Sequence, residues 1–538
     1  MRLSFITTVF GTTKVRDSIL GNCFRPPRAA REVLIMAGDT FELNEASIED
    51  IHYVLKSGRY SARSITQLYL ARIESLDKHG PAINSVIELN PDALTIADEL
   101  DREYGQNGPR GPLHGIPVLL KDSMNTADRM STTAGSLAMV GAPAPRDAFL
   151  VQKLRAAGAI ILGKSNLSEW ANFRATHSVS GWSARGGQTR NPYVLDRNPC
   201  GSSSGSAVAV AATLCAIAVG TETDGSIVCP SSINGIVGIK PTLGLISRNG
   251  VIPIAHSQDT PGPMARTVGD AAMLLNVLAG SDPNDPATEN SSRKAQSDYT
   301  KFLDPNGLRS ARLGVARRFF GFNTDVDQLI DECIGQMRGQ GAEIIDPIDY
   351  PVNEGLDEAE LEVLLYEFKA DLNAYLKTRS SLRVKSLSDI IAFNDERRSE
   401  EMPYFEQDIM IKAEAKGPLT ESTYKDVLER NHRLTRDEGI DAVIGKYRLD
   451  AIVAPSNGPA WLTDWVTGDH ISGGCSQPAA VAGYPHVTVP AGFVHGLPVG
   501  VSFFGPAWSE PTLLRIAYAF EQVTKRRQTP RFLPTVQF

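Results

Sequence analysis

Lys121 is the first residue of this sequence whose type and position suggest chemistry. It directly follows the apolar segment 116–120, which predicts a lysine at the end of a buried strand. A lysine taken alone is usually solvated or ion-paired, and a free lysine titrates near about 10.4. Burial penalises the ammonium and favours the neutral amine, which can act as a base near neutral pH. Lys121 is therefore a candidate general base.

Two serine-containing loops could supply the group that such a base activates. Ser202 lies in the Gly/Ser run 201–206, which is typical of a flexible linker but could also present N–H groups to an anion. The run lacks the Lys-Ser/Thr ending of a P-loop. Ser226, in isolation, is typical of a turn or helix cap. Because a serine hydroxyl is a poor nucleophile until its proton is removed, these residues alone leave both roles open.

Helix-like and strand-like segments alternate from about residue 41 onward and would have to position these side chains. Strands are predicted at 116–120, 159–163, 215–220, 451–454, 486–489 and 499–504, and helices at 48–76, 147–158, 206–214 and 511–525. Such alternation predicts an α/β fold with parallel strand pairs. The segment 352–441 is charged and helical in pattern, and we interpret it as a helical elaboration of one domain, where selectivity often resides.

Composition narrows the class of function. The chain has 538 residues, 42% of them hydrophobic and 22% charged, with a formal net charge of -8. The chain has no basic run, so its charge pattern does not indicate binding to nucleic acid or to an anionic membrane. The longest apolar run, 207–219, is too short to span a bilayer. Small-molecule or peptide chemistry is therefore the expectation, with no cofactor and no metal.

The six cysteines occupy positions 23, 200, 215, 229, 333 and 475 and contain no Cys-x-x-Cys pair. This spacing predicts neither a disulfide framework nor a zinc site.

Residues 1–35 are rich in arginine and poor in acidic residues. They have three interpretations: a transit peptide, a poor signal peptide, or upstream sequence before a start at Met36. We expect a cytoplasmic protein, or a mitochondrial or secreted one if the segment is a targeting peptide.

Four motifs together resemble the amidase signature family. They are Lys121-Asp122, Pro-Cys-Gly-Ser-Ser-Ser-Gly-Ser at 199–206, Gly-Thr-Glu-Thr-Asp-Gly-Ser-Ile-Val-Cys-Pro at 220–230 and Gly-Ile-Lys-Pro-Thr at 238–242. The resemblance is specific in the order and spacing of the motifs. It implies a single large domain, here 36–538, with a mixed β-sheet core covered by helices on both faces.

The resemblance also implies a Ser-Ser-Lys triad. Lys121, as a neutral amine, would accept a proton through Ser202 while Ser226 attacks the amide carbonyl and forms an acyl-enzyme. The same relay in reverse would protonate the departing nitrogen, so that ammonia or an amine leaves before water hydrolyses the ester. The backbone N–H groups of Thr223, Asp224, Gly225 and Ser226 would form the oxyanion hole.

Asp224 departs from the glycine that many members of the family have at this position. Aspartate tolerates left-handed backbone angles better than most residues, so the turn can be retained. Its carboxylate, however, would repel a developing oxyanion. We therefore expect this side chain to point away from the oxyanion hole and to be held by hydrogen bonds.

Within the family the resemblance is closest to the peptide amidase branch. The segments 163–173, 180–192 and 367–375, together with Thr-Asp-Gly-Ser at 223–226, carry this likeness. It implies release of ammonia from a peptide's C-terminal carboxamide. Trp182, Trp461 and Trp465 are candidates for the wall of the substrate cleft, although each could equally pack in the core.

Three alternatives remain open. They are the glutamine-hydrolysing subunit of a tRNA amidotransferase, a fatty acid amide hydrolase, and an inactive amidase-fold binding protein. The first would need partner subunits, and the second would be expected to carry a membrane anchor, which no apolar run supports. We expect an amide substrate as the only partner, and a monomer or homodimer.

Overall fold

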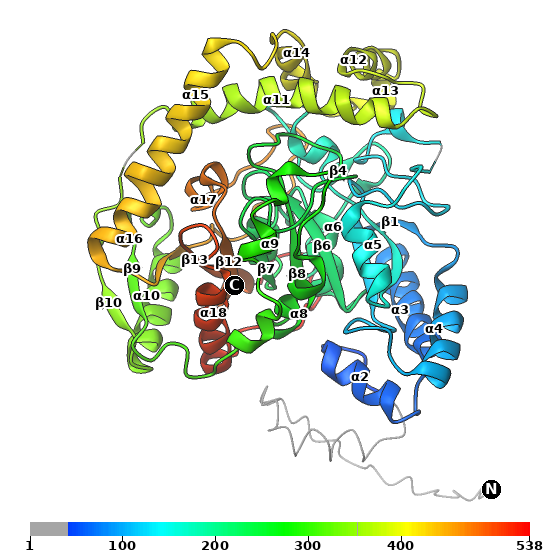
Figure 1. Cartoon of the computed structure of the whole chain (residues 1–538), viewed down its shortest axis with the longest axis horizontal. Coiled ribbons are helices and arrows are strands. Elements are labelled where there is room, and N and C mark those ends of the chain that lie inside the picture. The colour runs from blue at the N-terminus through cyan, green and yellow to red at the C-terminus, as the bar shows by residue number, and fades with distance from the viewer. Residues whose placement is uncertain (1–40, 142, 352, 538) are drawn as a thin grey trace, which may run out of the picture. The chain divides into compact units, whose positions relative to one another are not determined.

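The computed structural model describes residues 41–141, 143–351 and 353–537. The predicted extension 1–35 and the alternative start Met36 lie outside the described residues. Leu43–Phe538 forms one compact unit, shown from blue to red in Figure 1. The position of the domain boundary at residue 36 stays a prediction.

An eleven-stranded sheet runs through the described part of this unit. Its order is β1 (Val86–Leu89), β3 (Ile160–Ser165), β2 (Pro117–Lys121), β6 (Ile217–Glu222), β8 (Thr260–Ala265), β7 (Val237–Lys240), β12 (His486–Val494), β13 (Leu497–Phe504), β11 (Ala451–Pro455), β9 (Arg312–Val315) and β10 (Glu343–Ile345). A separate two-stranded sheet pairs β4 (Trp182–Ser183) with β5 (Gly187–Gln188). Parallel and antiparallel pairs both occur, so the predicted mixed α/β sheet is confirmed.

The centre of the sheet decides where the candidate residues meet. β2 pairs in parallel with both β3 and β6, and every residue of β2 is buried. Parallel strands end at the same edge of a sheet, and ligands of α/β folds bind outside these carboxyl ends. Lys121 ends β2 and Glu222 ends β6. The lysine and the loop that leads to Ser226 therefore share one edge.

Helices flank the sheet. They are α2 (Ile48–Lys56), α3 (Ala62–Arg72), α4 (Ala93–Asn107), α5 (Phe149–Ala156), α6 (Ser204–Ala211), α7 (Val228–Ile233), α8 (Val268–Leu278), α9 (Ser291–Lys294), α10 (Thr324–Gly339), α11 (Leu356–Thr378), α12 (Leu387–Glu396), α13 (Arg398–Glu401), α14 (Asp408–Glu414), α15 (Ser422–His432), α16 (Asp441–Tyr447), α17 (Gln477–Ala482) and α18 (Glu510–Thr524). Among the described helices none is long and apolar enough to cross a membrane.

Small side chains let α6 lie directly on the sheet, and this helix begins two residues after Ser202. All eight of its residues are buried. A Cβ atom at Gly205 would lie 2.3 Å from the carbonyl oxygen of Ser85, so only glycine fits there. The predicted helix 206–214 is confirmed, but it starts two residues earlier and ends three residues earlier than predicted.

The helices of the predicted elaboration 352–441 gather along one edge of the molecule, in yellow-green to yellow in Figure 1. α11 contacts α14 and α15, and α12 contacts α14. Their apolar side chains form a buried cluster with Trp170 and Phe173, which belong to the segment after β3. The elaboration is thus packed against the segment that borders the candidate site.

Candidate active site

Lys121 lies at the centre of the site, and its side chain is completely buried. Its Nζ atom is 2.7 Å from Ser202 Oγ. It also donates to the Thr221 carbonyl oxygen at 3.2 Å and lies 2.8 Å from Thr221 Oγ1. The structure therefore brings together the end of β2, the loop before α6 and the end of β6.

Burial lowers the pKa of Lys121 to about 7. The negative charges of Asp259 and Glu222 act in the opposite direction and raise it. A group with this pKa is about half neutral at neutral pH, so Lys121 can accept a proton there.

Ser226 sits between β6 and α7 and is 8% exposed. The Ser203 backbone N–H donates to the Ser226 carbonyl oxygen at 3.2 Å, which ties this loop to the residue next to Ser202. Glu222 Oε2 accepts from the N–H groups of Ile227 at 2.7 Å and Val228 at 3.0 Å. A buried carboxylate thus caps α7 and fixes the turn that presents Ser226.

The segment 223–226 is held from its other side by the loop that precedes β8. Thr223 Oγ1 donates to Asp259 Oδ1 at 2.6 Å. The side chain of Gln258 donates to the Thr223 carbonyl oxygen at 3.2 Å and to Glu360 at 2.7 Å. Gly225 has φ +77°, a left-handed conformation that favours glycine. The backbone N–H groups of this segment are therefore well anchored.

Asp224 lies where its surroundings disfavour the charged form of its carboxyl group. Burial, and then the nearby Glu360, raise the pKa of Asp224 well above its ordinary value, while a hydrogen bond with Ser476 opposes them. Its Oδ1 atom is buried and has no hydrogen-bond partner in the described structure. A neutral carboxyl group does not repel a developing oxyanion. The orientation expected from the sequence stays a prediction, and the raised pKa of Asp224, caused first by burial, is a second feature that the sequence did not reveal.

A cleft of about 340 Å³ adjoins the site. Its lining includes Ser123, Leu167, Trp170, Ala171, Thr221, Thr223, Ile252, Ile254, His256, Asp259 and Asp371. Trp170, Ala171 and the adjacent Asn172 have φ of +50°, +56° and +68°, and such strained runs cluster at functional sites. A second cavity, of about 550 Å³, is bordered by Asp224, Ser476 and Gln477.

Comparison with known proteins identifies the family. A family model described as Amidase matches residues 64–514. The chain belongs to the amidase signature family. A probable amidase of Arabidopsis thaliana is 44% identical over 508 residues, covering 93% of this chain and 94% of its own. The structure of the native peptide amidase from Stenotrophomonas maltophilia superimposes with a TM-score of 0.87 at 50% identity, covering 92% of this chain and 100% of that one.

A third relative bears on one of the alternatives. It is a Glutamyl-tRNA(Gln) amidotransferase subunit from Pseudomonas syringae, which is 34% identical over 493 residues and covers 90% of this chain and 98% of its own. This identity is lower than that of the two amidases. The amidase family, the fold and the activity of an amide hydrolase, all predicted from the motifs, are confirmed.

The cleft-wall role of the three candidate tryptophans stays a prediction, and each makes other contacts in this amidase. Trp182 packs edge-on against Phe405 in a small core cluster. The Trp461 Nε1 atom donates to Asp469 at 3.2 Å, and the Trp465 ring lies 4.2 Å from that of Tyr404. None of them is among the residues that line either described cavity.

Trp170 is the tryptophan that borders the amidase cleft. It lies inside the segment 163–173 that carries the likeness to peptide amidases, and this was the only signal in the sequence that could have singled it out. Aromatic residues alone could not separate core from cleft, because both environments bury them.

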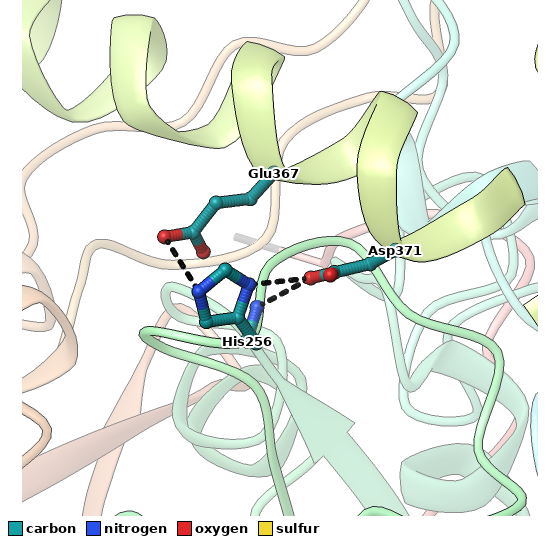
Figure 2. Close-up of side chains that lie close together, drawn as sticks. All are labelled: His256, Glu367 and Asp371. Atoms are coloured by element: carbon teal, nitrogen blue, oxygen red, sulfur yellow. Dashed lines mark hydrogen bonds and ion pairs between the residues drawn. The ribbon is translucent and has the colours of Figure 1, made fainter. Parts of the chain in front are cut away.

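The amidase has one group of His, Cys, Asp and Glu side chains in its described part that is close enough to hold a metal: His256, Glu367 and Asp371. Figure 2 shows the imidazole between the two carboxylates, which both project from α11. His256 Nδ1 lies 2.9 Å from Asp371, and Nε2 lies 3.5 Å from Glu367. These contacts already use the atoms that a metal would need, so the geometry is that of an ion-pair cluster linking α11 to the loop before β8.

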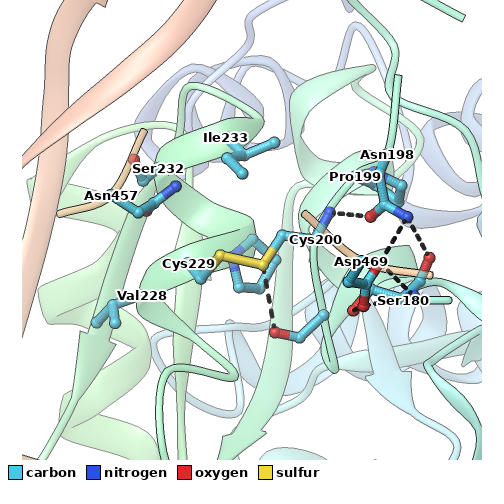
Figure 3. The surroundings of a disulfide bond; sticks show 12 residues. Ser180, Asn198, Pro199, Cys200, Val228, Cys229, Ser232, Ile233, Asn457 and Asp469 are labelled. Carbon is cyan, nitrogen blue, oxygen red and sulfur yellow. Dashed lines mark hydrogen bonds between the residues drawn. A yellow bond between two sulfur atoms is a disulfide. The ribbon is translucent and has the colours of Figure 1, made fainter. Parts of the chain in front are cut away.

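The prediction of no disulfide is wrong. Cys200 and Cys229, 29 positions apart, form one in this amidase, as Figure 3 shows. Close spacing is what reveals paired cysteines along a sequence, and these two lack it. The folded chain places the loop before α6 against the first turn of α7, where the Asn234 side chain donates to the Pro199 carbonyl oxygen at 2.8 Å and the Ser203 N–H donates to the Ser226 carbonyl oxygen at 3.2 Å.

Proposed function

We propose that this protein hydrolyses carboxamides of peptides or other small molecules through a Ser-Ser-Lys triad. The observation that carries the proposal is the completely buried Lys121, whose Nζ atom lies 2.7 Å from Ser202 Oγ. A lysine with a purely structural role would not need the hydroxyl of Ser202 as its partner, in a loop that adjoins the loop of Ser226. The Ser203 to Ser226 backbone hydrogen bond supports the same arrangement.

In the proposed mechanism the neutral amine of Lys121 takes the Ser202 hydroxyl proton as Ser202 takes the proton of Ser226. The Ser226 Oγ atom then attacks the carbonyl carbon and forms a tetrahedral intermediate. The proton returns along the same path to the amide nitrogen, the carbon–nitrogen bond breaks, and ammonia or an amine leaves. Water, activated by the same relay, hydrolyses the acyl-enzyme and regenerates Ser226.

The oxyanion would be stabilised by the backbone N–H groups of residues 223–226. Donors that are fixed before charge develops stabilise the transition state without reorganisation, and loss of one can cost about 100-fold in rate. The hydrogen bonds of Gln258 and Asp259 to Thr223, and that of Glu222 to the adjoining Ile227, support the role of this segment.

The substrate's acyl side would occupy the cleft bordered by Trp170 and Thr223. Apolar residues such as Ile252 and Ile254 line it together with polar groups, which suits a peptide or a small amide with an apolar side chain. The 50% identity to a peptide amidase supports peptide carboxamides as the first substrates to test.

The test is to offer the purified full chain peptide carboxamides, glutamine, aryl amides and fatty amides, and to measure released ammonia or amine. We expect turnover of peptide carboxamides without any added protein. Hydrolysis of glutamine alone, and only with added partner subunits, would contradict the proposal in favour of a role in tRNA amidation. The Ser226→Ala variant should lose turnover, whereas an inactive binding protein would have none to lose.

We further propose that the protein acts as a monomer or homodimer, which light scattering of the purified chain can measure.

The cellular compartment of the protein also stays a proposal. A disulfide is rare in reducing compartments, so it favours a mitochondrial intermembrane or secretory location over the cytoplasm expected from the sequence. Fractionation of the native cells tests this.

A further inference from the structure

The Cys200–Cys229 disulfide joins the two loops that carry the proposed catalytic serines. Cys200 stands two residues before Ser202, and Cys229 stands three residues after Ser226. The Cα atoms of the two cysteines are 6.2 Å apart. Figure 3 shows the bond between the segment at Pro199 and the start of α7.

We propose that this disulfide is a positioning device for Ser202 and Ser226, and that turnover depends on its oxidised state. The inference rests on the proposed function, because it assigns the disulfide to the proton relay between the two serines. In this inference neither cysteine acts as a catalytic group.

The Cys200 side of the bond has a backbone that needs support. Cys200 has φ +57°, in the left-handed region that residues with a Cβ atom disfavour. Its N–H donates to Asn198 Oδ1 at 2.8 Å, and its carbonyl oxygen accepts from Ser204 Oγ at 2.6 Å. When the side chain is released, relaxation of this backbone would move Ser202, which is two residues away.

The Cys229 side is coupled to Ser226 through one tight turn. The Cys229 N–H donates to the Gly225 carbonyl oxygen at 2.8 Å, and Gly225 precedes the proposed nucleophile. Glu222 holds the same turn through Ile227 and Val228. A displacement of the Cys229 side chain would therefore also displace Ser226.

Other contacts would keep the fold when the disulfide is open. The Asn234 side chain donates to the Pro199 carbonyl oxygen at 2.8 Å, and the Ser203 to Ser226 backbone hydrogen bond remains. Proton transfer between hydroxyls, however, requires heavy-atom distances of about 2.6 to 3.2 Å. A misplacement of about 1 Å can lower a rate about 100-fold, so chemistry is more sensitive than the fold.

A dithiol such as dithiothreitol can open this bond. Cys200 is 1% exposed, whereas Cys229 is partly exposed, so the reductant's thiolate is expected to attack Cys229 Sγ. The Cys200 thiolate leaves and takes a proton. The second thiol of the reductant then closes a cyclic disulfide and releases the Cys229 thiol, so that two electrons and two protons pass to the protein.

The experiment compares the oxidised full chain with the chain reduced under native conditions, using a peptide carboxamide as substrate. Mass spectrometry of alkylated peptides establishes the state of Cys200 and Cys229. We expect kcat to fall about 10- to 100-fold on reduction while KM changes less than about 2-fold. Circular dichroism should show a folded chain, and reoxidation of unalkylated protein should restore kcat.

Variants separate this role from other effects of a reductant. The double variant Cys200→Ser/Cys229→Ser should show the low kcat of the reduced chain and no response to dithiothreitol. Cys333→Ala, which changes a buried free cysteine in α10, should behave as wild type with and without reductant.

Undiminished kcat in the reduced, folded chain would overturn the inference. So would a loss of activity that appears only together with unfolding, because the disulfide would then serve stability alone. If the double variant does not fold, the reduced wild-type chain decides the question. Absence of amide hydrolysis in the oxidised wild-type chain would instead contradict the proposed function.

Discussion

Three buried lysines show what distinguishes a candidate base from a structural cation. Lys164 Nζ contacts Met124 O, Ser131 O and Thr132 Oγ1, and burial lowers its pKa to about 8. Burial also lowers the pKa of Lys240 to about 8, although Glu222 raises it. Lys121 has a lower pKa, about 7, and is the one of the three within hydrogen-bond distance of Ser202. Burial lowers the pKa of all three amines, and Lys164 also has a hydroxyl partner in Thr132, so it is the contact with Ser202 in particular that distinguishes Lys121.

Lys121→Ala should lower kcat with a peptide carboxamide about 1,000-fold, because general acid–base catalysis typically contributes about 100- to 10,000-fold. Steady-state kinetics measures this, and circular dichroism checks that the variant folds. Lys153→Met is a matched control, since this lysine lies in α5 and contacts Ala279, away from the site. Comparable turnover in Lys121→Ala and wild type would remove the lysine from the mechanism.

The pH dependence of kcat/KM should follow the neutral form of Lys121. The proton must leave Lys121 before it can act as a base, so activity should rise with pH through about 7 and level off above it. Asp259→Asn removes a negative charge that raises the pKa of Lys121. The midpoint of the rise should therefore move to lower pH in this variant. A midpoint that stays in place, or moves upward, would contradict this electrostatic assignment.

Among the elements, α11 is connected to the loop before β8 by two sets of side-chain contacts. His256 of the loop is paired with Glu367 and Asp371, and Gln258 donates to Glu360. Both elements line the cleft, the loop through Ile254 and the helix through Asp371. The helical elaboration thus shapes the cleft in which we propose that the substrate binds.

Asp371→Ala should loosen this connection and raise KM about 3- to 10-fold while kcat stays within about 2-fold, because the change affects binding more than chemistry. Steady-state kinetics with a series of peptide carboxamides measures both constants. Lys412→Ala in α14, which removes an exposed pair with Asp408, serves as the control. A fall in kcat at constant KM would show that α11 acts on the catalytic groups instead.

Sequence patterns predicted some elements far better than others. β2 and β6 were found because they overlap the buried apolar runs 116–120 and 215–219. β8 was missed, since Pro261 and Pro263 each remove a backbone donor and argue against a strand. The structure nevertheless pairs both prolines with β6. The predicted helix 48–76 is divided at residues 57–61, where Ser61 caps α3.

At the scale of the whole molecule, Arg527 ties the C-terminal segment to the start of the folded unit. Its guanidinium donates to both carboxylate oxygens of Glu45, at 2.7 and 2.8 Å. It also donates to the carbonyl oxygens of Ala211 at 2.9 Å and Gly235 at 2.7 Å. These two residues end α6 and follow α7, the helices that come after the two serine loops.

Arg527→Ala should lower the free energy of unfolding by about 3 kcal/mol, because it leaves a carboxylate and two carbonyl groups without their charged donor. Equilibrium denaturation measures this. Arg397→Ala, which breaks an exposed pair with Glu400, should change it by less than about 0.5 kcal/mol. Equal effects of the two substitutions would show that the contacts of Arg527 add no stability.

The sequence by itself determined the family, the α/β class and the amide-hydrolase activity, because these depend on local motifs whose order and spacing are visible along the chain. Lys121, Ser202 and Ser226 were assigned as the triad from the same motifs, and that assignment stays a proposal. The tertiary structure decided what depends on residues distant in sequence: the cleft at Trp170, the Cys200–Cys229 bond and the raised pKa of Asp224. Burial and electrostatic fields are properties of the packed chain, since they arise from neighbours that folding brings together. The order of residues along the chain can identify a side chain that could do chemistry. The packed structure then sets the charge of that side chain and the groups that it contacts.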